Sequence, residues 1–257
     1  DELVANGAEI IVANSYHLYL RPGPDIVAKS GGLHKFINWT RPILTDSGGF
    51  QAYSLSELKR VGDDGLAFQS HLNGSSHFFT PELVMEVQSK LGSDIAMCLD
   101  LFDPYPSPYN DVQSSVEKTI NWADKCKKCQ RLDQNLFGIV QGSTYKDLRV
   151  ECTKRLLDLN FEGYAIGGLC IGEPRELTYE ISETVTSFLP KDKPRYLMGA
   201  GYPEDLIDCV ALGIDMFDCV LPTRNARTGM AFTSEGKVVI RNSSYLEKFE
   251  KLDKNCV

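Results

Sequence analysis

Short apolar segments alternate with amphipathic ones along almost the whole chain, and this alternation limits the possible folds more than any other feature. Strands are expected at residues 9–13, 42–45, 94–99, 136–140, 164–166, 195–197 and 215–217. Helical patterns lie between most of them, at residues 81–91, 111–130, 145–157, 174–188 and 203–212. Strands that alternate with helices in this way form parallel βαβ units. The chain is therefore expected to be an α/β protein.

Two further observations refine the fold. The first strand is not followed by a glycine-rich dinucleotide fingerprint, which favours a (β/α)₈ TIM barrel over a Rossmann sheet. Residues 66–80, with Asn73-Gly74 in the middle, predict a β-hairpin, and residues 229–241 predict another that turns at 234–236. We expect an irregular TIM barrel with inserted hairpins, forming a single catalytic domain over residues 1–257.

The net charge of −8 argues against a protein that binds nucleic acid through bulk positive charge. Residues 219–257 nevertheless hold seven Lys or Arg and four Asp or Glu residues, so this end could bind phosphate. No apolar run is long enough for a membrane span, and the first residues do not resemble a secretory signal. These features predict a cytoplasmic protein without a membrane partner.

The eight cysteines are scattered through apolar segments and predict reduced, buried thiols. Cys126 and Cys129 have the spacing of a metal-binding pair. Because zinc sites need a second pair or histidines, we expect no metal at these two residues.

Polar or glycine-rich residues follow nearly every predicted strand. They are Asp46-Ser47-Gly48-Gly49, Asp100, Gln141-Gly142, Gly167-Gly168, Met198-Gly199 and Asp218. Any one of them could be a helix cap or a turn residue. Their repetition after six consecutive strands favours a shared pocket, because the carboxyl ends of barrel strands meet at one mouth.

The residue types at this mouth limit its chemistry. Neither histidine nor lysine follows a strand, and the four histidines, at positions 17, 34, 71 and 77, are expected in loops or hairpins. This disfavours a histidine-rich metal site and a Schiff base. Paired carboxylates suit glycosidic chemistry. An Asp and a Gln beside glycine amides can read the polar edge of a purine, provided that the nucleotide is turned out of its stack.

Several strings of residues resemble the bacterial tRNA-guanine transglycosylases. They are residues 14–18 (NSYHL), 20–23 (LRPG), 44–51 (LTDSGGFQ), 92–95 (GSDI), 167–169 (GGL), 196–199 (YLMG) and 213–224 (GIDMFDCVLPTR), together with Asp100 and Gln141-Gly142. The resemblance covers nearly the whole chain in the same order.

The resemblance implies a pentosyltransferase of queuosine modification. Such an enzyme exchanges the anticodon wobble guanine of the tRNAs for aspartate, asparagine, histidine and tyrosine for a 7-deazaguanine, either preQ1 or queuine. Asp218 matches the nucleophile that attacks C1′ and forms a covalent tRNA intermediate, and Asp46 matches the general acid/base. The base-binding set matches Asp100, Gln141, Gly167, Gly168, Leu169 and Met198, and the tRNA-binding set matches Arg224 and Arg227.

Three residues near the pocket bear on which base enters. Leu101 and Phe102 follow Asp100, where typical bacterial members have an acidic residue and a cysteine. Ile171 is bulky, as in bacterial members that use preQ1, whereas the members that use queuine have glycine. Ile171 favours preQ1, and Phe102 leaves queuine open.

The resemblance also implies a structural zinc, bound by a Cys-x-Cys-x-x-Cys group and a later histidine, and a homodimer. Only Cys256 matches a zinc ligand, the first of the set. Residues 219–257 would then begin the tRNA-contacting, zinc-binding region. The family's first strands also have no match, so the chain is expected to be incomplete at both ends.

Three other interpretations compete with this one. A non-catalytic accessory subunit of the eukaryotic enzyme would not need both Asp46 and Asp218. An archaeal relative that modifies the D-arm of tRNA is disfavoured by residues 217–227 (FDCVLPTRNAR). A metal-free glycoside hydrolase barrel would not need Arg224 and Arg227.

Overall fold

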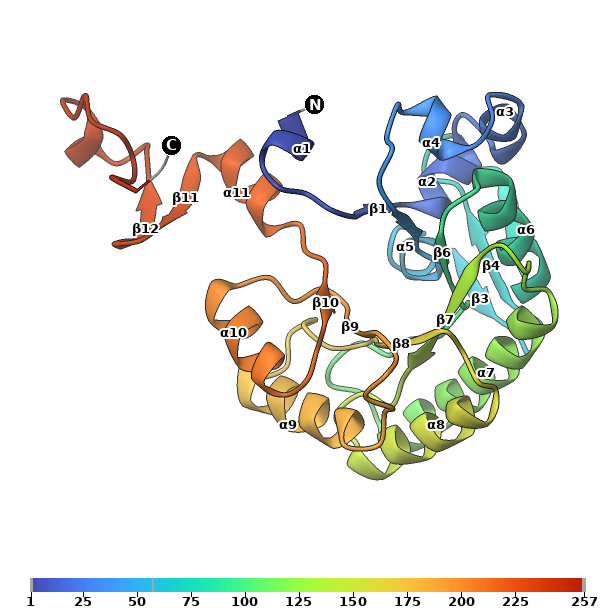
Figure 1. The fold of residues 1–257 in the computed structure, drawn as a ribbon. Coiled ribbons are helices and arrows are strands. Elements are labelled where there is room, and N and C mark those ends of the chain that lie inside the picture. Colours follow the sequence, from blue (N-terminus) through green and yellow to red (C-terminus); the bar gives the residue numbers. More distant parts are fainter. Residues whose placement is uncertain (1, 57, 256–257) are drawn as a thin grey trace.

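A curled, fully parallel sheet of seven strands forms the centre of the molecule (Figure 1). The computed structural model describes residues 2–56 and 58–255. In spatial order the strands are β1 (Ile11–Ala13), β2 (Ile43–Thr45), β6 (Ile95–Met97), β7 (Asn135–Val140), β8 (Gly163–Ile166), β9 (Arg195–Leu197) and β10 (Met216–Phe217). All seven predicted strands are confirmed.

Helices cover the outside of the curled sheet (Figure 1). They are α6 (Pro81–Leu91), α7 (Tyr109–Lys128), α8 (Lys146–Asp158), α9 (Arg175–Thr186) and α10 (Pro203–Ala211), which confirms the five predicted helices. Local sequence explains their ends. In α6 the Thr80 side chain accepts a hydrogen bond from the Leu83 amide, and Gly92 ends the helix with a φ of 68°. Parallel strands inside and helices outside form the expected barrel-type fold.

Several short elements were not predicted. They are α1 (Glu2–Ala5), α2 (Ser15–Leu20), α3 (Pro24–Lys29), α4 (Leu33–Phe36), α5 (Gly49–Ser54), α11 (Leu221–Thr228), the 3₁₀ turn η1 (Ser243–Tyr245) and the strand β3 (Lys59–Val61). Most of these helices have fewer than two turns, too few for a helical period to show in the sequence.

Both predicted hairpins are present. β4 (Leu66–Gln69) pairs with β5 (Ser76–Phe79), and β3 adds a third strand to this inserted sheet. β11 (Met230–Thr233) pairs with β12 (Gly236–Val239), and Figure 1 shows this hairpin apart from the central sheet. The proposed division of the chain at residue 219 stays a prediction.

The inserted sheet is fastened to α2 by two tyrosine–histidine pairs. The Tyr16 hydroxyl lies 2.8 Å from His71 Nδ1, and the Tyr19 hydroxyl lies 3.1 Å from His77 Nδ1. The expectation that all four histidines lie in loops or hairpins was wrong for His17, which belongs to α2, and for His34, which belongs to α4. These helices are too short to have been recognised.

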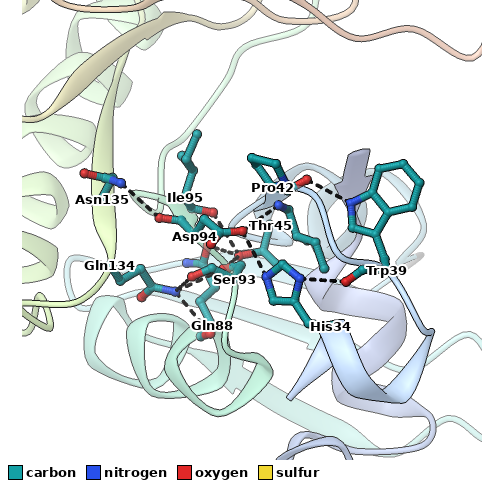
Figure 2. A network of polar contacts seen from close by, with 11 residues as sticks. His34, Trp39, Pro42, Thr45, Gln88, Ser93, Asp94, Ile95, Gln134 and Asn135 are labelled. Atoms are coloured by element: carbon teal, nitrogen blue, oxygen red, sulfur yellow. Dashed lines mark hydrogen bonds and ion pairs between the residues drawn. The ribbon is translucent and has the colours of Figure 1, made fainter. Parts of the chain in front are cut away.

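A polar network fixes the register of the strands beneath the mouth of the barrel (Figure 2). Asp94 Oδ2 accepts a hydrogen bond of 2.7 Å from the Ile43 amide and lies 3.0 Å from His34 Nε2. The Thr45 hydroxyl donates to Gln88 Oε1 at 2.9 Å and lies 2.6 Å from the Ser93 hydroxyl (Figure 2). This network joins β2 and β6 to the surrounding helices.

The Gln88 side chain takes the place of a strand residue. Its amide accepts a 2.9 Å hydrogen bond from the Met97 N–H and donates one of 2.9 Å to the Met97 carbonyl. These are the two bonds that a neighbouring strand would make, and β2 has already ended at this level. The backbone of β6 therefore stays satisfied while the chain leaves the sheet after Thr45.

Candidate active site

The polar residues that follow the strands line one cavity of about 680 Å³ at the carboxyl ends of the strands. The predicted residues on its walls are Asp46, Asp100, Gln141, Gly167, Gly168, Leu169, Met198, Asp218 and Arg224. All of them except Arg224, which lies on α11, come from six different strand ends. The prediction that these motifs converge is therefore correct for the geometry, and their catalytic roles stay predictions.

Asp46 follows β2, and two residues at the start of α2 donate hydrogen bonds to its carboxylate. Its Oδ1 accepts a hydrogen bond of 2.7 Å from the Ser15 amide, and its Oδ2 accepts one of 2.6 Å from Asn14 Nδ2. Burial raises the pKa of Asp46 to about 7, the Ser15 amide opposes the rise, and the charge of Asp218 adds to it. A carboxyl group with this pKa can both donate and accept a proton near neutral pH.

Asp218 follows β10 and is held by two donors. Its Oδ1 accepts hydrogen bonds from the Tyr196 hydroxyl at 2.5 Å and from the Gly199 amide at 3.0 Å. Burial, followed by the charge of Asp218, raises the pKa of Tyr196 far above its usual value, so this hydroxyl stays protonated and remains a donor. One carboxylate oxygen is thus fixed in place.

Asp100 and Gln141 form a second polar pair. Gln141 Nε2 donates to Asp100 Oδ2 at 2.7 Å. Burial raises the pKa of Asp100 to about 6, and the bonds from Gln141 and Ser47 oppose that rise. The side-chain amide of Gln141 lies close to the turn after β8. A Cβ on Gly168, whose φ is +65°, would lie 2.4 Å from Gln141 Oε1, and one on Gly167 would lie 2.6 Å from Nε2. Glycine is favoured at residue 168 by its φ, and a side chain at either position would displace the Gln141 amide.

Apolar side chains form the remaining walls of the cavity. Phe50 lines it and is 47% exposed, and the Phe102 ring packs on Phe50 with centroids 4.7 Å apart. Met198 and Ile171 also line it. A flat aromatic ring beside a carboxylate and an amide can stack on a planar heterocycle whose polar edge those groups read.

Comparison with known proteins decides the family. The family model described as queuine tRNA-ribosyltransferase matches residues 1–257. The chain belongs to the queuine tRNA-ribosyltransferase family. The protein of that name from Caldanaerobacter subterraneus subsp. tengcongensis is 60% identical over all of this chain and 69% of its own length. Those of Thermoanaerobacter pseudethanolicus and Geobacillus thermodenitrificans are 57% and 54% identical, over 69% and 68% of their lengths. The predicted resemblance and the predicted enzyme class, a pentosyltransferase, are confirmed.

Sequence reasoning missed three residues of this site. Asn14 and Tyr196 bind the two central carboxylates, and Phe50 forms a wall. Tyr196 lies within a strand, whereas only residues after strands were considered. It is two residues before Met198, so the period of a strand already predicts that both point to the same side.

The two predicted tRNA-binding arginines lie on α11 and differ in position. Both are exposed, and Arg224 lines the cavity. Arg227, three residues further along the same helix, is not among the residues that line it. Arg227 therefore lies outside the cavity, and its predicted contact with tRNA stays a prediction.

The cysteine prediction is only partly correct. The expectation of buried thiols was wrong for Cys129 and Cys170, which are exposed because they end a helix and lie in a loop at the cavity, respectively. Cys219, which also lines the cavity, is half-buried. Cys256 lies outside the described residues. Within residues 2–56 and 58–255, no cluster of three His, Cys, Asp or Glu residues could hold a metal ion. The structural zinc stays a prediction. No helix in the described part is long and apolar enough to cross a membrane.

Proposed function

We propose that this chain exchanges the wobble guanine of tRNAs with GUN anticodons for a 7-deazaguanine base through a covalent tRNA intermediate. The observation that carries the proposal is the convergence of Asp46, Asp218 and the Asp100–Gln141 pair on one cavity. The names of its relatives, queuine tRNA-ribosyltransferase, support the same chemistry.

The Asp100–Gln141 pair would bind the base. An ionised Asp100 would accept hydrogen bonds from the N1–H and amino groups of guanine, and the Gly168 amide would donate to its carbonyl oxygen. Leu169 would offer a backbone carbonyl to the substituent of the incoming base. Phe50 and Met198 would hold the two faces of the purine. The target nucleotide would have to be turned out of its stack to reach them.

Asp218 and Asp46 would have separate roles in the reaction. An Asp218 oxygen would attack C1′ of the ribose while the bond from C1′ to N9 breaks and its electron pair leaves with the base. A protonated Asp46 would give its proton to the departing guanine. The resulting carboxylate would then accept the N9 proton of the incoming base, whose N9 attacks C1′ and releases Asp218. This order returns both groups to their starting states.

We propose preQ1 as the incoming base, since the bulky residue Ile171 lines the cavity. Queuine, whose substituent is larger, is the alternative. Arg224 and Arg227 would bind the anticodon loop through phosphate. A homodimer, a cytoplasmic location and a structural zinc that includes Cys256 are proposed on the resemblance alone.

Labelled guanine incubated with the protein and bulk tRNA tests the function. Incorporation of label into tRNA is the expected result, and Asp218→Asn is the control that should incorporate none. A glycoside hydrolase or an accessory subunit would leave the tRNA unlabelled. Competition by unlabelled preQ1 and queuine would then show which base the site prefers.

A further inference from the structure

Arg149 is a fully buried arginine that lies behind the base-recognition residues. It belongs to α8 and is 0% exposed. Its Nη1 donates to the Val140 carbonyl at 2.7 Å and to the Gly167 carbonyl at 2.8 Å, and its Nε donates to the Ser143 carbonyl at 2.8 Å. Buried arginines normally have a carboxylate partner. Among the described residues none lies within ion-pair distance of Arg149, so its charge acts on backbone carbonyls.

Two of these carbonyls belong to peptide groups of the recognition site. The Gly167 carbonyl shares a peptide with the Gly168 N–H, and the Val140 carbonyl shares one with the Gln141 N–H. A cation bonded to a peptide oxygen draws electron density from the nitrogen and makes its N–H a stronger donor. Gly168 lines the cavity, and its N–H has no hydrogen-bond acceptor in the part of the chain that the structure describes.

A glycine in the chain after β7 allows α8, which carries Arg149, to lie close to the ends of β7 and β8. Gly142 has a φ of +137°, and a Cβ on it would lie 2.9 Å from the backbone nitrogen of Arg149. Any side chain at residue 142 would push α8 away from the ends of β7 and β8. Burial lowers the pKa of Arg149 to about 10, so the guanidinium remains charged at neutral pH.

We infer that Arg149 is a positioning residue that joins the ends of β7 and β8 and polarises the Gly168 amide toward the carbonyl oxygen of a bound purine. This inference rests on the proposed function. When the glycosidic bond breaks, the departing purine gains negative charge, part of it on that oxygen. A fixed and polarised donor stabilises such charge more than a mobile one does.

Guanine and 6-thioguanine, used as competitors of labelled-guanine exchange, test the inference. Both have the N1–H and amino groups that would meet Asp100, but sulfur is a weaker acceptor than oxygen for the Gly168 amide. The variants are Arg149→Met, which removes the charge, and Arg149→Lys, which keeps the charge but loses the fork that bridges two carbonyls. Leu156→Ala is the matched control, because Leu156 is equally buried on the same face of α8, two turns further on.

The wild type is expected to prefer guanine over 6-thioguanine. Arg149→Met should reduce this preference by about three- to tenfold, which is less than the loss of a whole hydrogen bond to a charged group because the Gly168 amide is weakened as a donor and still present. Arg149→Lys should reduce it less, and Leu156→Ala should leave it unchanged although it also destabilises the fold. If Arg149→Met does not fold, the preference of Arg149→Lys decides.

Two results would overturn the inference in distinguishable ways. Equal preferences in wild type and both Arg149 variants, with guanine exchange intact, would leave the proposed function standing and reduce Arg149 to a structural residue. An absence of guanine exchange in the wild type would remove the proposed function and this inference with it.

Discussion

The Tyr196 hydroxyl donates a hydrogen bond of 2.5 Å to Oδ1 of Asp218. The Gly199 amide donates to the same oxygen, whereas Oδ2 accepts no hydrogen bond from the described residues. The carboxylate is therefore held by one oxygen, and the other is left to react.

Removal of this hydroxyl should slow the chemical step. We expect Tyr196→Phe to reduce kcat by about 10- to 100-fold, the value of a hydrogen bond to a charged group, with the KM for tRNA nearly unchanged. Steady-state guanine exchange measures both constants. Tyr109→Phe is the control, because Tyr109 makes a similar bond of 2.6 Å to Asp147 on the surface. An equal loss in both variants would contradict a role at Asp218.

The two central carboxylates should differ in their effect on the covalent intermediate. Asp218→Asn keeps the size of the side chain but removes the charge that makes the oxygen nucleophilic, so no protein–RNA adduct should survive a denaturing gel. Binding of tRNA should stay within about tenfold, because the arginines still meet phosphate. Asp46→Asn should still form the adduct but slow transfer to the new base by about 10²–10⁴. The reverse pattern would exchange the two roles.

The reaction should depend on pH through Asp46. Transfer to the incoming base requires the ionised carboxylate, so kcat/KM for that base should fall as the pH drops below about 7. Asn14→Ala removes a donor to the anion and should move this midpoint to higher pH. Asn14 also caps α2, so Thr80→Ala, which removes the cap of α6, controls for lost stability. A midpoint that moves equally in both variants would refute the assignment.

Asp46 should also reduce the stability of the fold. Its pKa is about 7 in the folded protein, whereas the ordinary value of 3.8 applies to the unfolded chain, so the folded state binds more protons between these values. The free energy of unfolding should therefore decrease from about pH 4 to pH 7, by about 1–3 kcal/mol from this group. Asp46→Asn should unfold at a higher temperature than the wild type at pH 8 and show little gain at pH 4. Thermal unfolding at both pH values checks this, and a loss of stability at pH 8 would contradict it.

The turn after β8 should tolerate no side chain. Gly168→Ala would force Gln141 away from Asp100, and the KM for guanine should rise by about tenfold through the lost hydrogen bonding. Gly74→Ala is the matched control, since Gly74 has a similar φ of +73° with open space around it. It should lower stability and leave the KM unchanged. The same KM in Gly168→Ala and wild type would show that the amide is not held against this turn.

Sequence alone predicted the strands and the residues after them, because apolar strands and polar strand ends both leave local patterns. Tyr196 and Asn14 were missed for a physical reason: each acts by a hydrogen bond to a carboxylate far away in the chain, 22 and 32 residues from its partner. Arg149 has the sequence context of an ordinary surface residue of a helix. Only the packing of α8 against two strand ends shows that it is buried.

The Gln88 side chain makes the hydrogen bonds that a neighbouring strand would make to Met97, and this has an evolutionary consequence. Because this side chain satisfies the Met97 peptide groups, β6 does not depend on the turn at residues 46–49 for these two hydrogen bonds, whereas the Asp46 amide still donates to the Ala13 carbonyl of β1. A change of side chain in that turn therefore leaves the two bonds of Met97 in place, because a residue on α6 makes them. New activities could arise on this scaffold through the turn, provided that Gln88 is kept.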